Sequence, residues 1–357
     1  MKKLIAFLLM AAMVLSLAAC GEKPTDEQKP ADDKNTPVEA EYKLGMGVVV
    51  STESSKTGNA QVDATVAAVV TDAAGKIVAC RIDVAQNKMA VEGGVVDAAK
   101  TFQTKMELGS AYGMAGKVDN NGDGVMLEWD AQTKAFEEFV VGKTAAEVRA
   151  LELQEANGHK IAVNEDLLKA GCTIQITDHM EAVAKACEDA KGASFKTAAE
   201  FKLGVAAATT AESSTAASAD KDGSVQMYTD FGAAVVGADG KILAALTDAI
   251  QPKIAINVAG EIVEAAFSAT KRELGSAYGM EGKVDNNGDG VMLEWDAQSK
   301  AFSDYAAGKT AADLKGMQTQ EVNGHLIAVD EDLLKAGCTI QISGMVATVA
   351  GAAEYAR

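Results

Sequence analysis

The sequence predicts an α+β protein made of two tandem copies of a small domain, each an antiparallel or mixed sheet with packed helices. The first observation behind this prediction is a long internal repeat. Glu107–Met114 recurs unchanged as Glu273–Met280, and Thr173–Ile176 recurs as Thr339–Ile342, both at an offset of 166 residues (273 − 107). The second observation is that β-rich runs and runs with helical spacing follow one another inside a copy. Two copies are too few for a solenoid, and each is long enough to fold alone.

The strand signals come first in each copy. Gln61–Val70 and Lys76–Val84 are rich in strand-forming residues and flank Asp72–Gly75, a sequence typical of turns. Together they predict an antiparallel hairpin. Thr173–Ile176 is a further, short candidate strand, because β-branched residues suit strands.

Helical spacing follows the hairpin. Apolar residues recur at three- and four-residue intervals over Trp129–Val141 and Ala145–Leu153, with Gly142 between them as a stop signal. A last helix is predicted over Asp178–Ala190, opened by an aspartate cap. We therefore expect helices to pack on one side of the sheet in each copy.

The N-terminus predicts export and lipid anchoring. Two lysines precede an apolar run from Leu4 to Leu17, and small residues then lead to Cys20. This run is too short for a comfortable membrane span and has the flanks of a lipoprotein signal, so residues 1–20 are interpreted as the signal region. An ordinary secretory signal is the alternative. In the preferred interpretation Cys20 carries acyl chains that hold the protein on the extracytoplasmic face of the cell membrane.

The remaining chain divides into a tether and the two copies. Residues 21–40 contain three of the four prolines and few apolar side chains, so they predict a disordered tether. The first copy is predicted over residues 41–190 and the second over residues 200–357, with a linker at 191–199.

Charge and cysteine spacing exclude several classes of function. A net charge of −18 makes nucleic acid an unfavourable partner of the folded part. The cysteines after Cys20 form no CxxC pair, which leaves thioredoxin-like, zinc and c-type haem sites without support. A disulfide between the equivalent Cys172 and Cys338, or free buried thiols, would both fit an exported protein. The common hydrolase and nucleotide-binding motifs are missing, and His159, His179 and His325 are expected in exposed loops.

The order of features resembles FMN-binding domains of the kind found in flavinylated subunits of sodium-pumping and electron-transport complexes. The shared features are a hairpin with Asp-x-x-Gly-Lys-Ile at its turn and a small-residue run that ends in threonine before a helix. More narrowly, the lipid anchor, Ala60–Asp63 and Glu107–Met114 resemble the duplicated flavin lipoproteins that Gram-positive bacteria use for extracellular electron transfer. The resemblance covers most of residues 41–190 and, more loosely, 200–355.

The resemblance implies a cofactor and a mode of attachment. In this family a flavin transferase links FMN to a threonine hydroxyl by a phosphoester bond, and the matching positions are Thr173 and Thr339. Glycine just before the acceptor would let a phosphate approach the backbone. A threonine that only opens a strand is the alternative. The small residues that precede the two threonines are Gly171, Cys172, Gly337 and Cys338.

Aromatic residues of the repeated block are candidates for stacking on the flavin ring. They are Trp129 and Trp295, with Tyr112 and Tyr278. A role for each as a core or interface residue is the alternative.

A second chemistry is predicted in the same block. The segment from Asp119 to Asp130 has oxygen-bearing residues at positions 1, 3, 5 and 12 and a glycine at position 6, the spacing of a calcium loop. An Asn-Gly-Asp-Gly tight turn without metal is the alternative. The candidate calcium ligands are Asp119, Asn121, Asp123, Asp130, Asp285, Asn287, Asp289 and Asp296.

Two functions follow from these patterns. The favoured hypothesis is a membrane-anchored FMN carrier that receives electrons from a quinol-linked membrane donor and passes them to extracellular acceptors, with one FMN in each copy and the side chains serving to hold the cofactor. The other hypothesis is a calcium-binding adhesion module on the cell surface without a redox cofactor.

Overall fold

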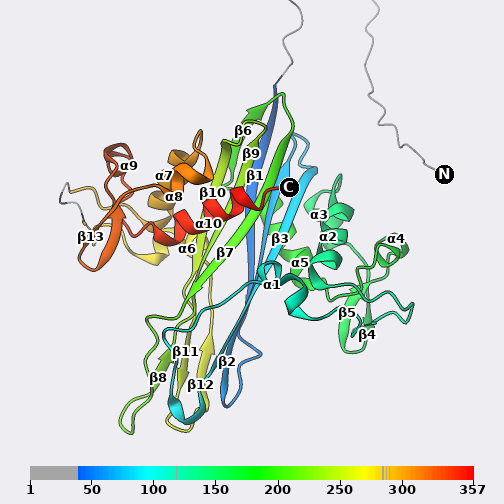
Figure 1. The fold of residues 1–357 in the computed structure, drawn as a ribbon, viewed down its shortest axis with the longest axis horizontal. Helices are drawn as coiled ribbons and strands as arrows, with labels where there is room; N and C mark the ends of the chain where they lie inside the picture. The colour runs from blue at the N-terminus through cyan, green and yellow to red at the C-terminus, as the bar shows by residue number, and fades with distance from the viewer. Residues whose placement is uncertain (1–38, 118, 284, 287, 289) are drawn as a thin grey trace, which may run out of the picture. The chain divides into compact units, whose positions relative to one another are not determined.

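Two antiparallel sheets lie at the centre of the protein (Figure 1). The computed structural model describes residues 39–117, 119–283, 285, 286, 288 and 290–357, so Cys20, the signal region and residues 21–38 lie outside it. The first sheet has the order β3-β2-β1-β6 and the second β10-β9-β7. The strands are β1 (Ala40–Ser51), β2 (Asn59–Thr71), β3 (Ile77–Ala90), β6 (Ala193–Thr197), β7 (Phe201–Thr210), β9 (Tyr228–Gly237) and β10 (Ile242–Ile250).

The helices cover the outer faces of these sheets. Those of the first half (residues 39–199) and those of the second half (residues 200–357) lie on opposite sides of the paired sheets (Figure 1). The first half contains α1 (Lys105–Leu108), α2 (Trp129–Val140), α3 (Ala145–Arg149), α4 (Glu165–Lys169) and α5 (Thr177–Glu188). The second contains α6 (Lys271–Leu274), α7 (Trp295–Ala306), α8 (Ala311–Lys315), α9 (Glu331–Lys335) and α10 (Ser343–Glu354).

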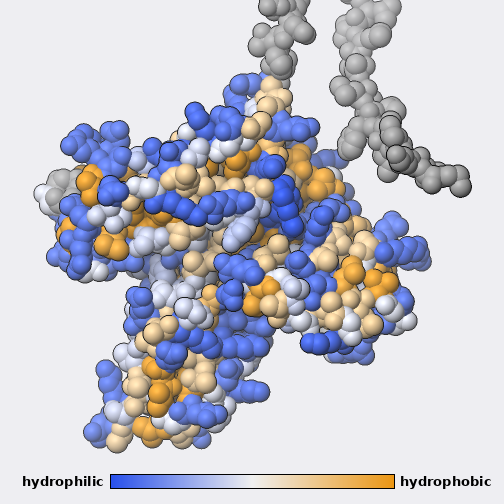
Figure 2. Space-filling model, in the orientation of Figure 1, coloured by the Kyte–Doolittle hydropathy of each residue, from blue (hydrophilic) through white to orange (hydrophobic). Residues whose placement is uncertain are grey.

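Smaller elements complete the fold. A third sheet has the order β12-β11-β8, and its end of the molecule exposes hydrophobic groups, Val258 and Val263 among them (Figure 2). Each half also has a short hairpin, β4-β5 or β13-β14. Their bounds are β8 (Gly223–Val225), β11 (Lys253–Ile256), β12 (Ile262–Ala266), β4 (Leu153–Ala156), β5 (His159–Ala162), β13 (Thr319–Val322) and β14 (His325–Ala328), and the 3-10 turns are η1 (Glu92–Gly94), η2 (Gly109–Tyr112) and η3 (Gly275–Tyr278).

The α+β class is confirmed, with antiparallel pairing in every strand pair of the described residues. The predicted hairpin is present as β2 and β3. The predicted helix over Ala145–Leu153 is wrong beyond Arg149, because the chain turns and Leu153 begins β4. The predicted strand at Thr173–Ile176 is also wrong: this segment makes a single backbone hydrogen bond to β5, from Ile176 to Lys160, and leads directly into α5, whose N-cap is Ile176 and not an aspartate.

One apolar core is shared by the two sheets. It contains Leu44 and Met46 from β1 together with Phe231 and Val235 from β9, all at most 5% exposed. The opposite faces of the same strands pack against helices, so β2 is buried along almost its whole length. Burial of each large side chain contributes about 1.5–3 kcal/mol, which makes this shared core a major source of stability.

Two glycines allow helices to cross the sheets at close range. Gly45 in β1 faces the carbonyl oxygen of Ala186 in α5, and a Cβ atom at this position would overlap that oxygen. Gly204 in β7 has the same relation to Ala352 in α10. The repeated Leu-Gly pair in the two halves is therefore explained by backbone contact between sheet and helix.

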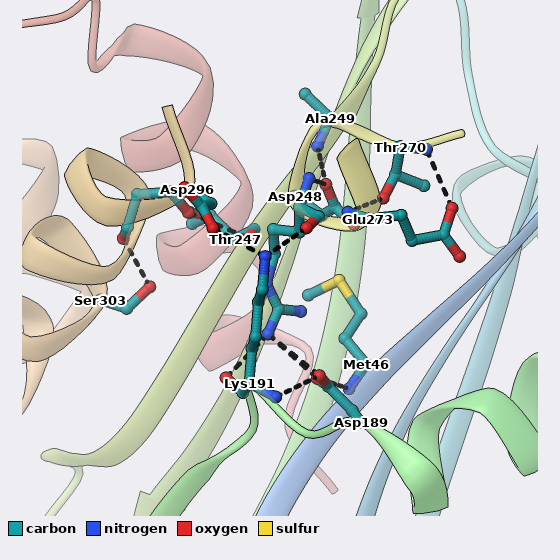
Figure 3. Close-up of polar contacts among 12 residues, drawn as sticks. Met46, Asp189, Lys191, Thr247, Asp248, Ala249, Thr270, Glu273, Asp296 and Ser303 are labelled. Carbon is teal, nitrogen blue, oxygen red and sulfur yellow. Dashed lines mark hydrogen bonds and ion pairs between the residues drawn. The ribbon is translucent and has the colours of Figure 1, made fainter. Parts of the chain in front are cut away.

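A polar network joins the two halves beside the shared core (Figure 3). The Arg272 guanidinium donates to both carboxylate oxygens of Asp189, at 3.3 and 3.0 Å, and to the carbonyl of Lys191 at 2.8 Å. The Lys191 ammonium in turn donates to Asp296 at 2.7 Å. The side chains of Arg272 and Asp189 are only 9% and 11% exposed, so their charges depend on each other.

Replacement of Arg272 is expected to destabilise the protein. Arg272→Ala leaves the Asp189 carboxylate buried without its ion pair, and we expect a loss of about 3 kcal/mol in the free energy of unfolding measured in urea. The control is Lys196→Ala, which removes a pair with Glu41 whose two side chains are 62% exposed, and which should change the value by less than about 0.5 kcal/mol. Equal effects of the two substitutions would contradict the assignment.

Candidate functional site

A cavity of about 970 Å³ lies in the first half. It is bordered by the end of β1, by β2 and β3, by α1 and α2, and by the start of α5. The second half adds a wall, since Ala265, Ala266 and Phe267 also line the cavity. The Thr52 hydroxyl donates to the Ala265 carbonyl at 2.9 Å and so fixes this wall to the first half. The size is within the range of small-molecule and cofactor sites.

Aromatic rings and a lysine form one side of the cavity. The Lys105 ammonium lies 4.9 Å from the Tyr112 ring centre and 5.3 Å from that of Trp129. Thr104 and Glu107 form a capping box that begins α1 and thereby places Lys105. The carboxylate of Glu128 accepts hydrogen bonds from two backbone amides of the preceding loop, which holds Trp129 at the start of α2. Trp129 is only 2% exposed, so Tyr112, which is partly exposed, offers the larger ring surface to a flat, polarisable ligand.

Two buried polar atoms at this cavity have no hydrogen-bond partner among the residues that the structure describes. They are Nδ1 of His179 and Oδ1 of Asp63. His179 is 5% exposed, and burial, followed by the charge of Lys105, lowers its pKa to about 3, so the ring is neutral. Leaving a buried polar atom unpaired costs about 1–3 kcal/mol. Both atoms therefore favour a ligand that offers polar groups.

The charge at the cavity is mainly negative. Glu53, Asp63 and Asp178 line it, against one lysine, Lys105. Burial raises the pKa of Asp178, and the nearby charge of Asp63 raises it further. The surface therefore suits hydrogen-bond donors better than an anionic group.

Thr173, the predicted flavin-attachment residue of the first half, lies next to this cavity without lining it. Thr173 is fully buried, and its hydroxyl donates to the Gln132 side chain at 3.2 Å. The next residues, Ile174 and Gln175, do line the cavity. Thr339 is likewise buried and bonded to Gln298 at 3.4 Å.

The glycine before each threonine serves local packing. Gly171 has φ = 88°, and a Cβ atom there would lie 2.5 Å from Leu127 Cδ1. Gly337 has φ = 89° and faces Leu293 in the same way. The space that the sequence assigns to a phosphate is therefore occupied by a leucine side chain in both halves. Cys172 and Cys338 are fully buried free thiols, and Cys80 and Cys187 are also free.

The predicted calcium loop is a turn in which three aspartates accept backbone hydrogen bonds, whereas Oδ1 of Asn121 is buried and has no hydrogen-bond partner among the described residues. Asp119 accepts from the amides of Gly122 and Gly124 at 2.7 and 3.0 Å, and Asp123 accepts from Val125 at 2.7 Å. The Asn121 amide donates to Asp123 at 2.8 Å. Asp130 accepts from the amide of Ala131 at 2.8 Å.

The second copy of the loop is described in part. Asp285 accepts from Gly288 at 2.7 Å, and Asp296 is paired with Lys191, whereas Asn287 and Asp289 lie outside the described residues. Within the described parts of the chain, no group of three or more His, Cys, Asp or Glu side chains is arranged to hold a metal ion. Calcium binding stays a prediction.

Sequence reasoning missed several residues of the cavity. His179 was expected in an exposed loop, and this expectation is wrong because the ring packs 5.8 Å from the Trp129 ring and 5.9 Å from that of Phe136. Asp63 could have been noticed as a carboxylate inside a run of apolar strand residues. Lys105 carries no such signal in the sequence.

Comparison of the chain with protein-family models, curated proteins and solved structures gives no match. The resemblance to FMN-binding domains therefore stays an expectation from the motifs. Among the described residues, none of the helices has the length and apolarity that crossing a membrane requires.

The buried carboxyl that positions α1 should make stability depend on pH. Asp83 accepts from the Met106 amide of α1 at 3.2 Å, and burial raises its pKa to about 6. Because the folded pKa exceeds the unfolded value of about 3.9, the stabilising contribution of the neutral acid is complete below pH 4 and is lost as pH rises through 6.

Asp83→Asn should remove this dependence while keeping an acceptor for the Met106 amide. The free energy of unfolding of the variant minus that of the parent should rise by about 2–3 kcal/mol between pH 4 and pH 7.5. Glu165→Gln on the surface of α4 controls for a lost carboxylate. A difference that stays constant with pH would contradict the role given to Asp83.

Proposed function

We propose that the protein is a lipid-anchored, extracytoplasmic electron carrier that holds FMN in the cavity of the first half. The observation that carries the proposal is this 970 Å³ cavity, in which Trp129 and Tyr112 stand beside two unpaired buried polar atoms. The export signal ending at Cys20 supports the location, and the motif resemblance supports the cofactor.

The lining residues fit the parts of a flavin. The rings of Trp129 and Tyr112 and the Met114 sulfur offer contacts to the isoalloxazine ring. Asp63 and neutral His179 offer partners to the ring N–H and the ribityl hydroxyls. When bound, FMN supplies reversible uptake and release of electrons, and these side chains supply binding, orientation and electrostatics.

The phosphate fits this lining less well than the ring. Three carboxylates face the cavity, and a phosphate dianion would find only Lys105 as a cationic partner there. The buried Thr173 hydroxyl is held by Gln132 and covered by its neighbours. Both facts favour a flavin bound through its ring system and without a phosphoester bond to Thr173.

Electron transfer partners complete the proposal. Electrons would come from a quinol-linked donor in the membrane and go to extracellular acceptors, with the lipid anchor keeping the carrier near the donor. A flavin transferase is the further partner if attachment is covalent.

Flavin binding should depend on Trp129. We expect the mature protein to quench the fluorescence of added FMN, and Trp129→Ala to weaken binding about tenfold, a loss of about 1.4 kcal/mol of ring contact. Trp295→Ala is the matched control from the second half and should leave the Kd unchanged. Absence of binding by the parent protein, or equal effects of the two substitutions, would contradict the proposal.

The mode of attachment is tested separately by mass spectrometry. After co-production with a flavin transferase, we expect yellow protein that releases FMN on denaturation, with unmodified peptides containing Thr173 and Thr339. Riboflavin should bind with nearly the affinity of FMN. A Thr173 peptide that carries the mass of FMN less water would overturn noncovalent binding, and its loss in Thr173→Ala would identify the acceptor.

A further inference from the structure

The two halves can be compared position by position. Asp83 in β3 accepts from the amides of Val84 and Met106, and Asp248 in β10 accepts in the same way from Ala249 and Arg272. In the strand pairings, Asp83 faces Val66 and Asp248 faces Phe231. The sheets therefore correspond at an offset of 165 residues (248 − 83), and the helices at 166.

This correspondence shows that the cavity residues differ in the second half. Tyr228 stands at the position of Asp63, and Asp230 at that of Thr65. At the start of the last helix, Gly344 and Met345 replace Asp178 and His179. Trp295, Tyr278 and Lys271 are kept as counterparts of Trp129, Tyr112 and Lys105. The two halves thus have the same aromatic residues and lysine at these positions but differ at the positions of the polar residues Asp63, Asp178 and His179.

Tyr228 ties the retained lysine into the protein. The Lys271 ammonium donates to the Tyr228 hydroxyl at 3.1 Å and lies 4.7 Å from the ring centres of both Tyr228 and Tyr278. Lys271 is only 7% exposed and lines a pocket of about 310 Å³, whereas Lys105 is partly exposed and lines the cavity of about 970 Å³. The lysine of the second half already has the partners that a ligand would supply in the first.

Asp230 fills the space that an aspartate side chain takes in the first half. A Cβ atom added to Gly344 would overlap the carboxylate of Asp230. The glycine and the aspartate are therefore complementary: the loss of a side chain at 344 makes room for the one at 230. In place of neutral His179, Met345 is 2% exposed and belongs to the apolar core of this half.

The second half instead contributes to the site of the first. Its segment Ala265–Phe267 walls the cavity, held there by the hydrogen bond from Thr52. From these contacts we infer that the chain binds one flavin, in the first half, and that the second half is a closed copy that completes this single site. The inference rests on the proposed function for the identity of the ligand.

The stoichiometry of FMN binding to the full mature chain tests this inference. Equilibrium dialysis at saturating FMN should give one FMN per chain. The affinity for this FMN should be lowered by Trp129→Ala and unchanged by Trp295→Ala. Two FMN per chain would support the proposed function and overturn the closed second copy. The double substitution Tyr228→Asp and Asp230→Thr copies the first half and should raise the stoichiometry above one. If the stoichiometry stays at one FMN per chain while circular dichroism shows that the variant is folded, the claim that Tyr228 and Asp230 close the second half is refuted.

A measurement without flavin separates the two proposals. An amine-acylating reagent should modify Lys105, which is partly exposed, faster than Lys271, which is 7% exposed, as measured by peptide mass spectrometry. If the parent chain binds no FMN but this difference is present, the proposed function fails and the closed second copy stands. Equal rates of modification at the two lysines would overturn the closed copy whatever the result with FMN.

Discussion

The apolar contact between the two sheets is the constraint on which the rest of the structure depends. Each sheet has helices on one face only, and the other face is covered by the partner sheet. Leu44 and Phe231 would therefore lose their cover if the halves were separated, at about 1.5–3 kcal/mol for each large side chain. Asn87 adds specificity, because its buried amide donates to Thr209 and Thr229 of the opposite sheet at 3.0 and 3.2 Å.

The contact between the sheets also allows the two halves to differ. Unpaired buried polar atoms cost stability, and among the described residues two of them, Nδ1 of His179 and Oδ1 of Asp63, lie at the 970 Å³ cavity of the first half, while Oγ of Ser343 is one in the second half. In the second half the same framework pairs Lys271 with Tyr228 and leaves a smaller pocket of about 310 Å³. Stability of the unit and affinity for a ligand can thus be supplied by different halves.

The sequence predicts the class and most elements because their signals are local. The Asp72–Gly75 turn identifies the β2–β3 hairpin, and helical spacing identifies α2 within one residue. Strand β6, in the stretch assigned to a linker, is missed because its pairing with β1 links residues some 150 positions apart. The Thr173 segment is misread because its amides do not form a ladder with one strand: the Thr173 amide donates to the Gln132 side chain and the Ile176 amide to Lys160 of β5. Of the site, Trp129 was predicted, whereas His179 and Asp63 depend on burial, which distant elements decide.

The wall that the second half contributes to the cavity has a thermodynamic consequence. A ligand bound between Trp129 and Phe267 would contact both halves. Its binding free energy would therefore add to the free energy needed to separate the two halves. Occupancy would then be coupled to the rigidity of the whole unit and not to that of one half. Arg272 and Asp189 join the two halves but do not line the cavity. A force or partner that breaks this ion pair would therefore lower the affinity for the ligand at a distance.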